Sequence, residues 1–219
     1  MAFLMELYKV VNQLEWPRKQ HFEFYRQFEQ PFFSIGFSLD AKALFNTVKQ
    51  VNGQFFHAYM YLILKTVNAS EPFRLRIVED QVRDYQQING SCAMLAEDNT
   101  FRYVDFDFHE DYQQFSQGII EAKAQAISRP FMHDGFDESQ THKNTVYMSV
   151  IPWISFTSFS HAWQGKDDSG VPRIVVGKMD DNFQMPISID VHHALVDGFH
   201  VGAFTQQLQK AFDEFAKNS

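Results

Sequence analysis

The sequence predicts an α/β fold, more closely an α+β two-layer domain in which helices pack on a mixed β-sheet. Segments with the periodicity of amphipathic helices alternate along the chain with short segments rich in aromatic and β-branched residues, which are typical of strands. No internal repeat, low-complexity tract or flexible linker divides the 219 residues, of which 45% are hydrophobic and 21% are charged. This composition is typical of one globular core. We therefore expect residues 1–219 to form a single domain.

The N-terminal part of the chain is expected to contain a strand followed by a helix. Residues 21–39 are rich in aromatic side chains and contain Pro31, a pattern that predicts strand and loop. Residues 40–53 show helical periodicity, with Asp40 placed to cap the helix and Gly53 placed to end it.

A second, more apolar helix is expected over residues 55–69. Its hydrophobic stretch contains His57 and Lys65 and is shorter than the roughly 18 apolar residues that a membrane span needs. The first residues of the chain also lack the small-residue cleavage site of a signal peptide. We therefore expect no membrane association and a cytoplasmic location.

The remaining two thirds of the chain mix both kinds of segment. Strands alternate with helices there, as they do in layered domains. Strands are expected over residues 73–78, 81–88, 100–108, 145–151, 173–179 and 184–193, and helices over residues 109–128 and 198–217.

Charge and cysteine content exclude several classes of protein. The formal net charge of −8 argues against a nucleic-acid-binding protein, which would carry a basic stripe. Cys92 is the only cysteine, so the chain can form no internal disulfide and no cysteine-based zinc site. We expect no metal ion and no nucleic acid among its ligands.

Three ionisable groups interrupt an apolar segment near the C-terminus, which reads ISIDVHHALVDGFHVGAF over residues 187–204. In a strand, His192 and His193 point to opposite faces, so both cannot bind one metal ion. Spacing alone leaves two interpretations. Either one histidine is a hydrogen-bonded core residue and Asp197 only turns the chain, or one histidine is a general base that accepts a proton near neutral pH.

The motif HHALVDG fits the signature HHxxxDG, and other segments agree with the same family in the same order. These segments are RKQHFEFYRQF (18–28), SVIPWISFTSF (149–159), VVGKM (175–179) and VDGFHVGAF (196–204). Together they resemble the chloramphenicol acetyltransferases, whose HxxxDG motif is shared with the acyltransferase cores of 2-oxo-acid dehydrogenase complexes. The resemblance covers nearly the whole chain from Arg18 onward.

The resemblance implies roles for four residues. His193 would be the general base that takes a proton from a substrate hydroxyl, with its ring oriented by its own backbone carbonyl. Asp197 would pair with Arg18 and support the site, rather than act in a catalytic triad. Ser149 would donate a hydrogen bond to the oxyanion that forms when the hydroxyl attacks the thioester. The acetyl group would then pass directly, without a covalent acetyl-enzyme.

The resemblance also implies the ligands and the assembly. Acetyl-CoA would be the co-substrate, chloramphenicol or a similar small hydroxyl compound would be the acceptor, and the protein would be a homotrimer with active sites at the subunit interfaces. The acceptor-binding residues would be Phe24, Tyr25, Phe33, Phe101, Tyr103, Phe136, His161, Trp163 and Val175. The cofactor-binding residues would be Trp153, Gly177 and Lys178.

Some positions depart from the family pattern and leave two alternatives open. Tyr103 stands where the family has a small residue, and residues 160–173 form a charged segment in place of one rich in asparagine and aromatic residues. The first alternative is an acetyltransferase of the same family that acts on a different hydroxyl or amine. The second, from another class, is a small-molecule-binding module on the same trimer scaffold. The intact His193 and Ser149 argue against this second alternative.

Overall fold

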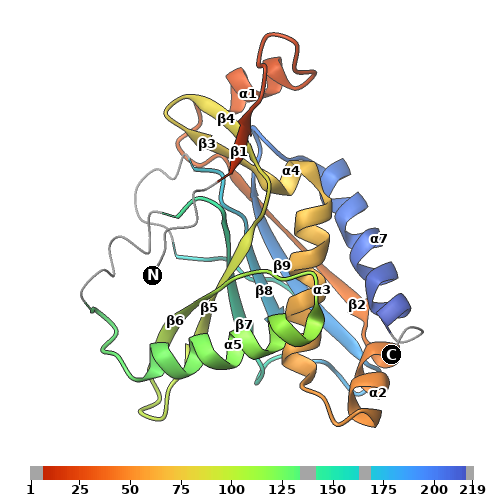
Figure 1. Ribbon diagram of the computed structural model, residues 1–219. Coiled ribbons are helices and arrows are strands. Elements are labelled where there is room, and N and C mark those ends of the chain that lie inside the picture. The colour runs from red at the N-terminus through yellow and green to blue at the C-terminus, as the bar shows by residue number, and fades with distance from the viewer. Residues whose placement is uncertain (1–6, 134–141, 163–168, 216–219) are drawn as a thin grey trace.

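The computed structural model describes residues 7–133, 142–162 and 169–215 (Figure 1). Its strands are β1 (Tyr8–Val10), β2 (Phe32–Asp40), β3 (Leu75–Val78), β4 (Gln81–Tyr85), β5 (Asn89–Leu95), β6 (Phe101–Phe106), β7 (Thr145–Ile151), β8 (Arg173–Gly177) and β9 (Gln184–His192). Its helices are α1 (Lys19–Tyr25), α2 (Lys42–Gln50), α3 (Phe55–Ala69), α4 (Glu71–Arg74), α5 (Tyr112–Ile127) and α7 (Gly198–Phe215).

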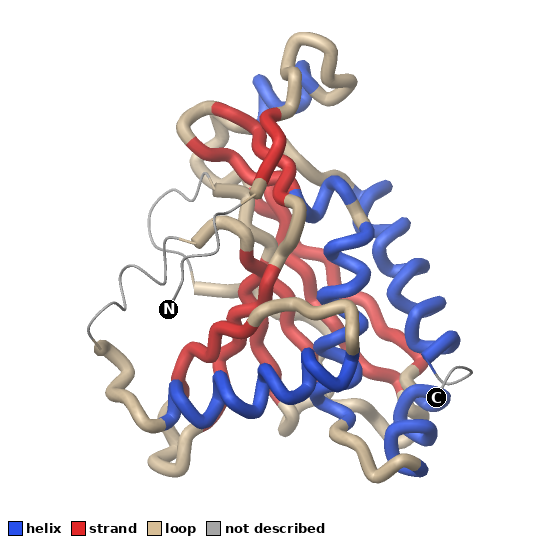
Figure 2. Tube along the Cα trace, in the orientation of Figure 1, coloured by secondary structure: helices blue, strands red, loops and turns tan. Residues whose placement is uncertain are grey.

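Most of the strands belong to one large mixed sheet. The order of its strands is β2-β9-β8-β7-β5-β6, with β5, β7 and β8 parallel to one another and the other pairs antiparallel. A small sheet of order β1-β4-β3 lies at one end of the molecule (Figure 1). The long helices gather on one side of the large sheet (Figure 2). The predicted fold class, a mixed sheet with helices packed on it, is therefore confirmed.

The two faces of the large sheet differ in chemistry, because side chains alternate along each strand. On the face toward the helices, β9 contributes Ile187, Ile189 and Val191, all of them buried. Helix α3 packs on this face and is buried over most of its length. The hydrophobic core of the domain lies in this layer.

The opposite face, which we call the polar face, contains two rows of paired residues that run across the whole sheet. In a row, each residue is paired with the next across a strand boundary, so their side chains point to the same side. One row, called here the serine row, is Tyr103, Ala93, Ser149, Val175, Ser188 and Gly36. The neighbouring row, called here the polar row, is Asp105, Ser91, Tyr147, Arg173, Asp190 and Ser34.

The segment that follows β7 crosses this polar face. Phe156 covers Gly177, where an added Cβ would lie only 2.8 Å from the phenyl ring, so a larger residue would push the segment away. The carbonyl oxygen of Thr157 lies 3.2 Å from the Cβ position of Gly36. Further along, His161 contacts Asp190 of the polar row. The segment is therefore held against three neighbouring strands.

Several elements differ from the sequence-based expectation: β1 was not predicted, α4 includes two residues of the strand expected over 73–78, and two further differences have a clear physical reason. Residues 19–25 form a helix and not a strand, with Phe22 buried and Phe24 exposed. The expectation was wrong because aromatic and polar residues alternate in HFEFY, as they do in a strand. Strand β5 was not predicted, since its Asn-Gly start is typical of a turn. A Cβ at Gly90 would lie 2.5 Å from the ring of Phe106, so glycine is needed for this close packing.

The stability of the domain should depend on pH through His57, a buried residue of α3. Burial, and secondarily the charge of Lys123, lower the pKa of His57 below 6.5. Between the lowered pKa and 6.5 the unfolded chain binds more protons than the folded one, so the free energy of unfolding falls as the pH drops below 6.5. Denaturant titrations at pH 7.5 and 5.5 should show this fall, and His57→Gln should reduce it. The variant His109→Gln, at an exposed histidine, should keep the full fall.

Candidate active site

The two adjacent histidines have different environments. His192, the last residue of β9, is 1% exposed, contacts the ring of Phe32 edge-on and accepts a hydrogen bond at Nδ1 from the backbone N–H of Ala194. His193 follows the end of the strand and is partly exposed, and its ring stacks on Tyr25 with centroids 3.9 Å apart. Of the pair, His193 is therefore the histidine that a ligand can reach.

The ring of His193 is held in one tautomer. Its Nδ1 lies 3.2 Å from the carbonyl oxygen of Val196. A carbonyl oxygen can only accept a hydrogen bond, so Nδ1 carries the proton and Nε2 has a free lone pair. The expectation that the imidazole of His193 is oriented by its own backbone carbonyl is wrong. The tight turn after β9 brings the carbonyl oxygen of Val196 to Nδ1. The carbonyl oxygen of His193 accepts a hydrogen bond from Arg18 instead.

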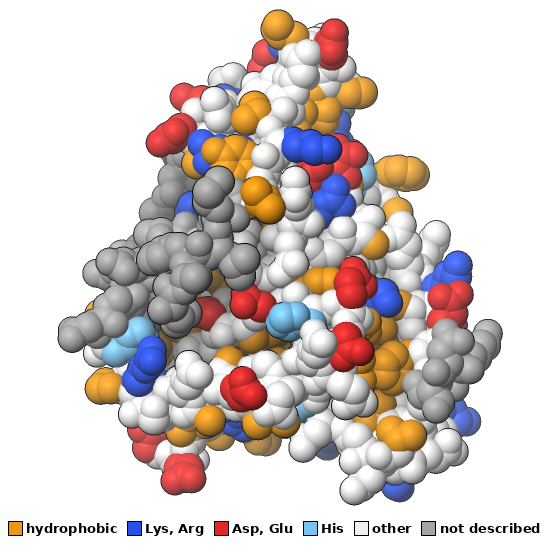
Figure 3. Space-filling model, viewed as in Figure 1, with side chains coloured by type: hydrophobic (Ala, Val, Ile, Leu, Met, Phe, Trp, Pro, Cys, Tyr) orange, Lys and Arg blue, Asp and Glu red, His pale blue; other side chains and the backbone are white. Residues whose placement is uncertain are grey.

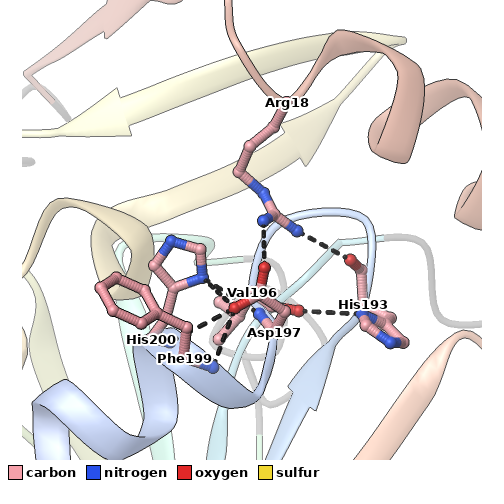
Figure 4. A network of polar contacts seen from close by, with 6 residues as sticks. All are labelled: Arg18, His193, Val196, Asp197, Phe199 and His200. Atoms are coloured by element: carbon pink, nitrogen blue, oxygen red, sulfur yellow. Dashed lines mark hydrogen bonds and ion pairs between the residues drawn. The ribbon is translucent and has the colours of Figure 1, made fainter.

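Arg18 connects the start of α1 with the turn that contains His193 (Figure 4). Its Nη1 lies 2.5 Å from Oδ2 of Asp197, and its Nη2 donates to the carbonyl oxygen of His193 at 3.2 Å. The expected contact between Arg18 and Asp197 is thus present. The guanidinium of Arg18 thus holds both ends of the turn from His193 to Asp197. Loss of this side chain would therefore disturb the position of His193.

Asp197 also caps helix α7. Its Oδ1 accepts hydrogen bonds from the backbone N–H groups of Phe199 and His200 and lies 2.9 Å from Nδ1 of His200 (Figure 4). Burial alone would raise the pKa of the Asp197 carboxyl, but the hydrogen bond from Arg18 and the interactions with His200 outweigh it, so this pKa is lowered. The carboxylate is therefore charged at neutral pH and does not contact the ring of His193.

Substitutions at Asp197 should separate its two interactions. Asp197→Asn keeps a capping oxygen but loses the charge that pairs with Arg18, and should cost about 1–3 kcal/mol of folding free energy. Asp197→Ala loses the cap as well and should cost about 1 kcal/mol more. Denaturant unfolding would measure both, with Asp181→Asn at an exposed turn as the control. Equal stability of Asp197→Asn and the wild type would show that the pair with Arg18 contributes nothing.

Ser149 lies in the serine row, far from His193 of the same chain. It is paired with Val175, which is paired with Ser188, so two strand spacings separate it from β9. His193 comes five residues after Ser188 along the chain. Strand spacing and rise per residue then place the two Cα atoms about 19 Å apart. The two expected catalytic groups do not meet within one chain.

The other expected acceptor-binding residues fall into separate groups. Phe33 lies beside the ring of His193 at a centroid distance of 4.7 Å, and Phe24 packs edge-on against Tyr25. The remaining expected residues lie on the polar face or outside the described part of the chain. Phe101 and Tyr103 form an aromatic cluster on β6 with Phe131, Val175 lies in the serine row, His161 contacts Asp190, and Phe136 and Trp163 lie outside the described residues.

The expected cofactor-binding residues lie together at the ends of β7 and β8. The backbone N–H of Lys178 donates to the carbonyl oxygen of Ile154, next to Trp153. Trp153 and Lys178 are both exposed, and Gly177 lies beneath Phe156. An exposed indole and an exposed lysine at neighbouring strand ends suit a ligand with an apolar chain and anionic groups.

Sequence reasoning missed one polar residue of this region, Asp190. It is 1% exposed, yet its Oδ2 lies 2.7 Å from Nδ1 of His161. The alternation in ISIDVHH places Asp190 on the same face of the strand as His192, which was the available signal. Within the described ranges, no group of three or more His, Cys, Asp or Glu side chains could hold a metal ion, and no helix is long and apolar enough to cross a membrane.

Two of the solved structures with a similar fold are acetyltransferases. A chloramphenicol acetyltransferase structure is 24% identical and superposes with a TM-score of 0.82 over 94% of this chain and 100% of that chain. The dihydrolipoamide acetyltransferase of Azotobacter vinelandii is 15% identical, with a TM-score of 0.61 over 90% of this chain and 87% of that one. At these identities the similarity establishes the fold.

Sequence comparisons establish the family. The family model described as chloramphenicol acetyltransferase matches residues 6–209. A chloramphenicol acetyltransferase of Proteus mirabilis is 32% identical over 95% of this chain and 96% of its own length, and one of Escherichia coli is 30% identical over 95% of both. The chain belongs to the chloramphenicol acetyltransferase family and is an acetyltransferase. The resemblance inferred from HHxxxDG and the accompanying segments is therefore confirmed.

Proposed function

We propose that this protein transfers the acetyl group of acetyl-CoA to a hydroxyl of chloramphenicol or of a closely similar small alcohol. The observation that carries the proposal is the geometry of His193. Its Nδ1–H is held by the carbonyl oxygen of Val196, and its ring is partly exposed with Nε2 available to accept a proton. Family membership and the names of the full-length relatives support the identity of both substrates.

In the proposed reaction, His193 takes the proton of the acceptor hydroxyl at Nε2 as the hydroxyl oxygen attacks the thioester carbonyl. The proton on Nδ1 keeps its hydrogen bond to Val196, so the imidazolium that forms is stabilised in place. The hydroxyl of Ser149 donates a hydrogen bond to the carbonyl oxygen of the thioester as negative charge develops on that oxygen. When the tetrahedral species collapses, the carbon–sulfur bond breaks and the protonated His193 returns the proton to the leaving thiolate. No covalent enzyme intermediate is formed.

The separation of about 19 Å between Ser149 and His193 supports a site shared by two subunits. Both groups must lie within hydrogen-bond reach of one reacting carbonyl, so each active site takes His193 from one chain and Ser149 from its neighbour. The exposed cluster of Phe101, Tyr103 and Phe131 lies on the same face as Ser149 and offers an apolar surface to that neighbour. A homotrimer with three such interfaces satisfies this arrangement.

Acetyl-CoA fits the group formed by Trp153, Gly177 and Lys178. The exposed indole of Trp153 can line the pantetheine chain, and the exposed ammonium group of Lys178 can pair with phosphate. Gly177 is paired with Ile151, the last residue of β7, which lies two residues beyond Ser149. A thioester bound at these strand ends would therefore lie close to the serine.

A thiol-release assay tests the proposal. The protein is mixed with acetyl-CoA and chloramphenicol, and free CoA is measured with a thiol reagent. We expect release that depends on chloramphenicol. Release with other alcohols or amines only would favour the alternative acceptor, and no release with any acceptor would favour a non-catalytic binding module.

A further inference from the structure

His161 and Asp190 form a second histidine–carboxylate pair that the proposed mechanism does not use. His161 lies on the segment after β7, and Asp190 lies on β9 in the polar row. The distance between Nδ1 of His161 and Oδ2 of Asp190 is 2.7 Å, and the two side chains are 16% and 1% exposed. The pair joins segments 29 residues apart in the sequence and lies on the same face of the sheet as Ser149.

The carboxylate fixes the tautomer of His161. An ionised carboxylate only accepts hydrogen bonds, so Nδ1 of His161 carries a proton and Nε2 presents a lone pair. The described residues give Nε2 no hydrogen-bond partner. Since Nε2 is on the ring edge away from Asp190, His161 offers a positioned hydrogen-bond acceptor above the polar face.

The position of the pair relative to Ser149 suits one small ligand. Asp190 and Ser149 lie in neighbouring rows, two strands apart, which places their Cα atoms about 12 Å apart. A small alcohol whose reacting end lies at Ser149 can reach His161 with its other end.

A purely structural role explains this pair less well. Oδ1 of Asp190 is buried and has no hydrogen-bond partner among the described residues. Burying a carboxylate that is only partly hydrogen-bonded costs free energy, and an apolar residue at such a position is often neutral or stabilising. Ser188, two residues away on the same face of β9, also buries a hydroxyl without a described partner, so this face of the strand carries a second buried polar group.

We propose that His161, positioned by Asp190, recognises a second hydrogen-bond donor on the acceptor, separate from the hydroxyl that is acetylated. The acceptor would then be a small alcohol with an additional hydroxyl or amine. This inference rests on the proposed function. In this role His161 determines specificity, and Asp190 is a positioning residue that acts through His161.

Kinetics with two matched alcohols test the inference. The probes are chloramphenicol and the analogue in which its secondary hydroxyl is replaced by hydrogen. The wild type should prefer chloramphenicol by about tenfold in kcat/KM, equivalent to one hydrogen bond of about 1.4 kcal/mol. His161→Phe should lower kcat/KM for chloramphenicol about tenfold more than for the analogue, so that the preference is abolished, and circular dichroism checks that the variant is folded. His161→Gln, which keeps an acceptor atom, should retain part of the preference.

A double-mutant comparison tests whether Asp190 acts through His161. Asp190→Asn should reduce the preference in the wild-type background and should not change it further in the His161→Phe background. Ser188→Ala is the matched control on the same strand and should keep the full preference. If His161→Phe lowers kcat/KM equally for both alcohols, the pair is only structural and the inference is wrong. If the wild type uses both alcohols equally well, only this inference fails, whereas a wild type that acetylates neither alcohol overturns the proposed function and this inference with it.

Discussion

His193→Ala is expected to lower kcat for acetyl transfer by about 10²–10⁴, the usual contribution of a general base. The substitution removes Nε2, the atom that accepts the proton, together with the contact between Nδ1 and the carbonyl oxygen of Val196. Because His193 is partly exposed and follows the strand, the fold and the assembly should survive. Steady-state kinetics, combined with circular dichroism and sedimentation, would measure both effects.

His192→Ala is the matched control for this prediction. His192 is 1% exposed and packs against Phe32, so its loss should lower the melting temperature more than it lowers the rate. If His192→Ala abolishes turnover in a fully folded protein while His193→Ala remains active, the roles of the two histidines are reversed.

Ser149→Ala is expected to lower kcat by about 10²–10³, because it removes the hydrogen-bond donor to the developing oxyanion. The change in KM should be small, since the ground-state carbonyl carries little negative charge. Ser188→Ala removes a hydroxyl from the same row two strands away and should leave kcat within about threefold of the wild type. A Ser149→Ala variant as active as Ser188→Ala would exclude an oxyanion role for Ser149.

The sequence predicts much of this fold because most elements have a clear periodicity. Helix α3 and strand β9 were predicted nearly to their ends, since α3 contains a long, mostly apolar stretch and β9 alternates apolar and polar residues. Helix α1 was not predicted, because it is short, buries only Phe22 and alternates aromatic and polar residues as a strand does. Strand β5 pairs with β6 and β7, and Phe106 packs on its Gly90; no local sequence pattern indicates these contacts.

The site was predicted in its motif and not in its arrangement. HHxxxDG points to His193 and Asp197, but Arg18 is 179 positions from Asp197, and only the resemblance paired them. The pairing of His161 with Asp190 depends on a segment that crosses three strands, which no spacing in the sequence indicates. Contacts between subunits cannot be predicted from local sequence patterns, because they depend on the shapes of two folded surfaces.

The central claim is that each active site combines His193 of one subunit with Ser149 of another, and mixing two inactive variants tests it most directly. His193→Ala and Ser149→Ala are unfolded together at equal concentrations, refolded and assayed. In randomly mixed trimers, about a quarter of the sites combine an intact His193 with an intact Ser149, so we expect about a quarter of the wild-type activity. Each variant refolded alone should stay inactive. A mixture no more active than the separate variants, in a sample shown to contain mixed trimers, would contradict the shared site.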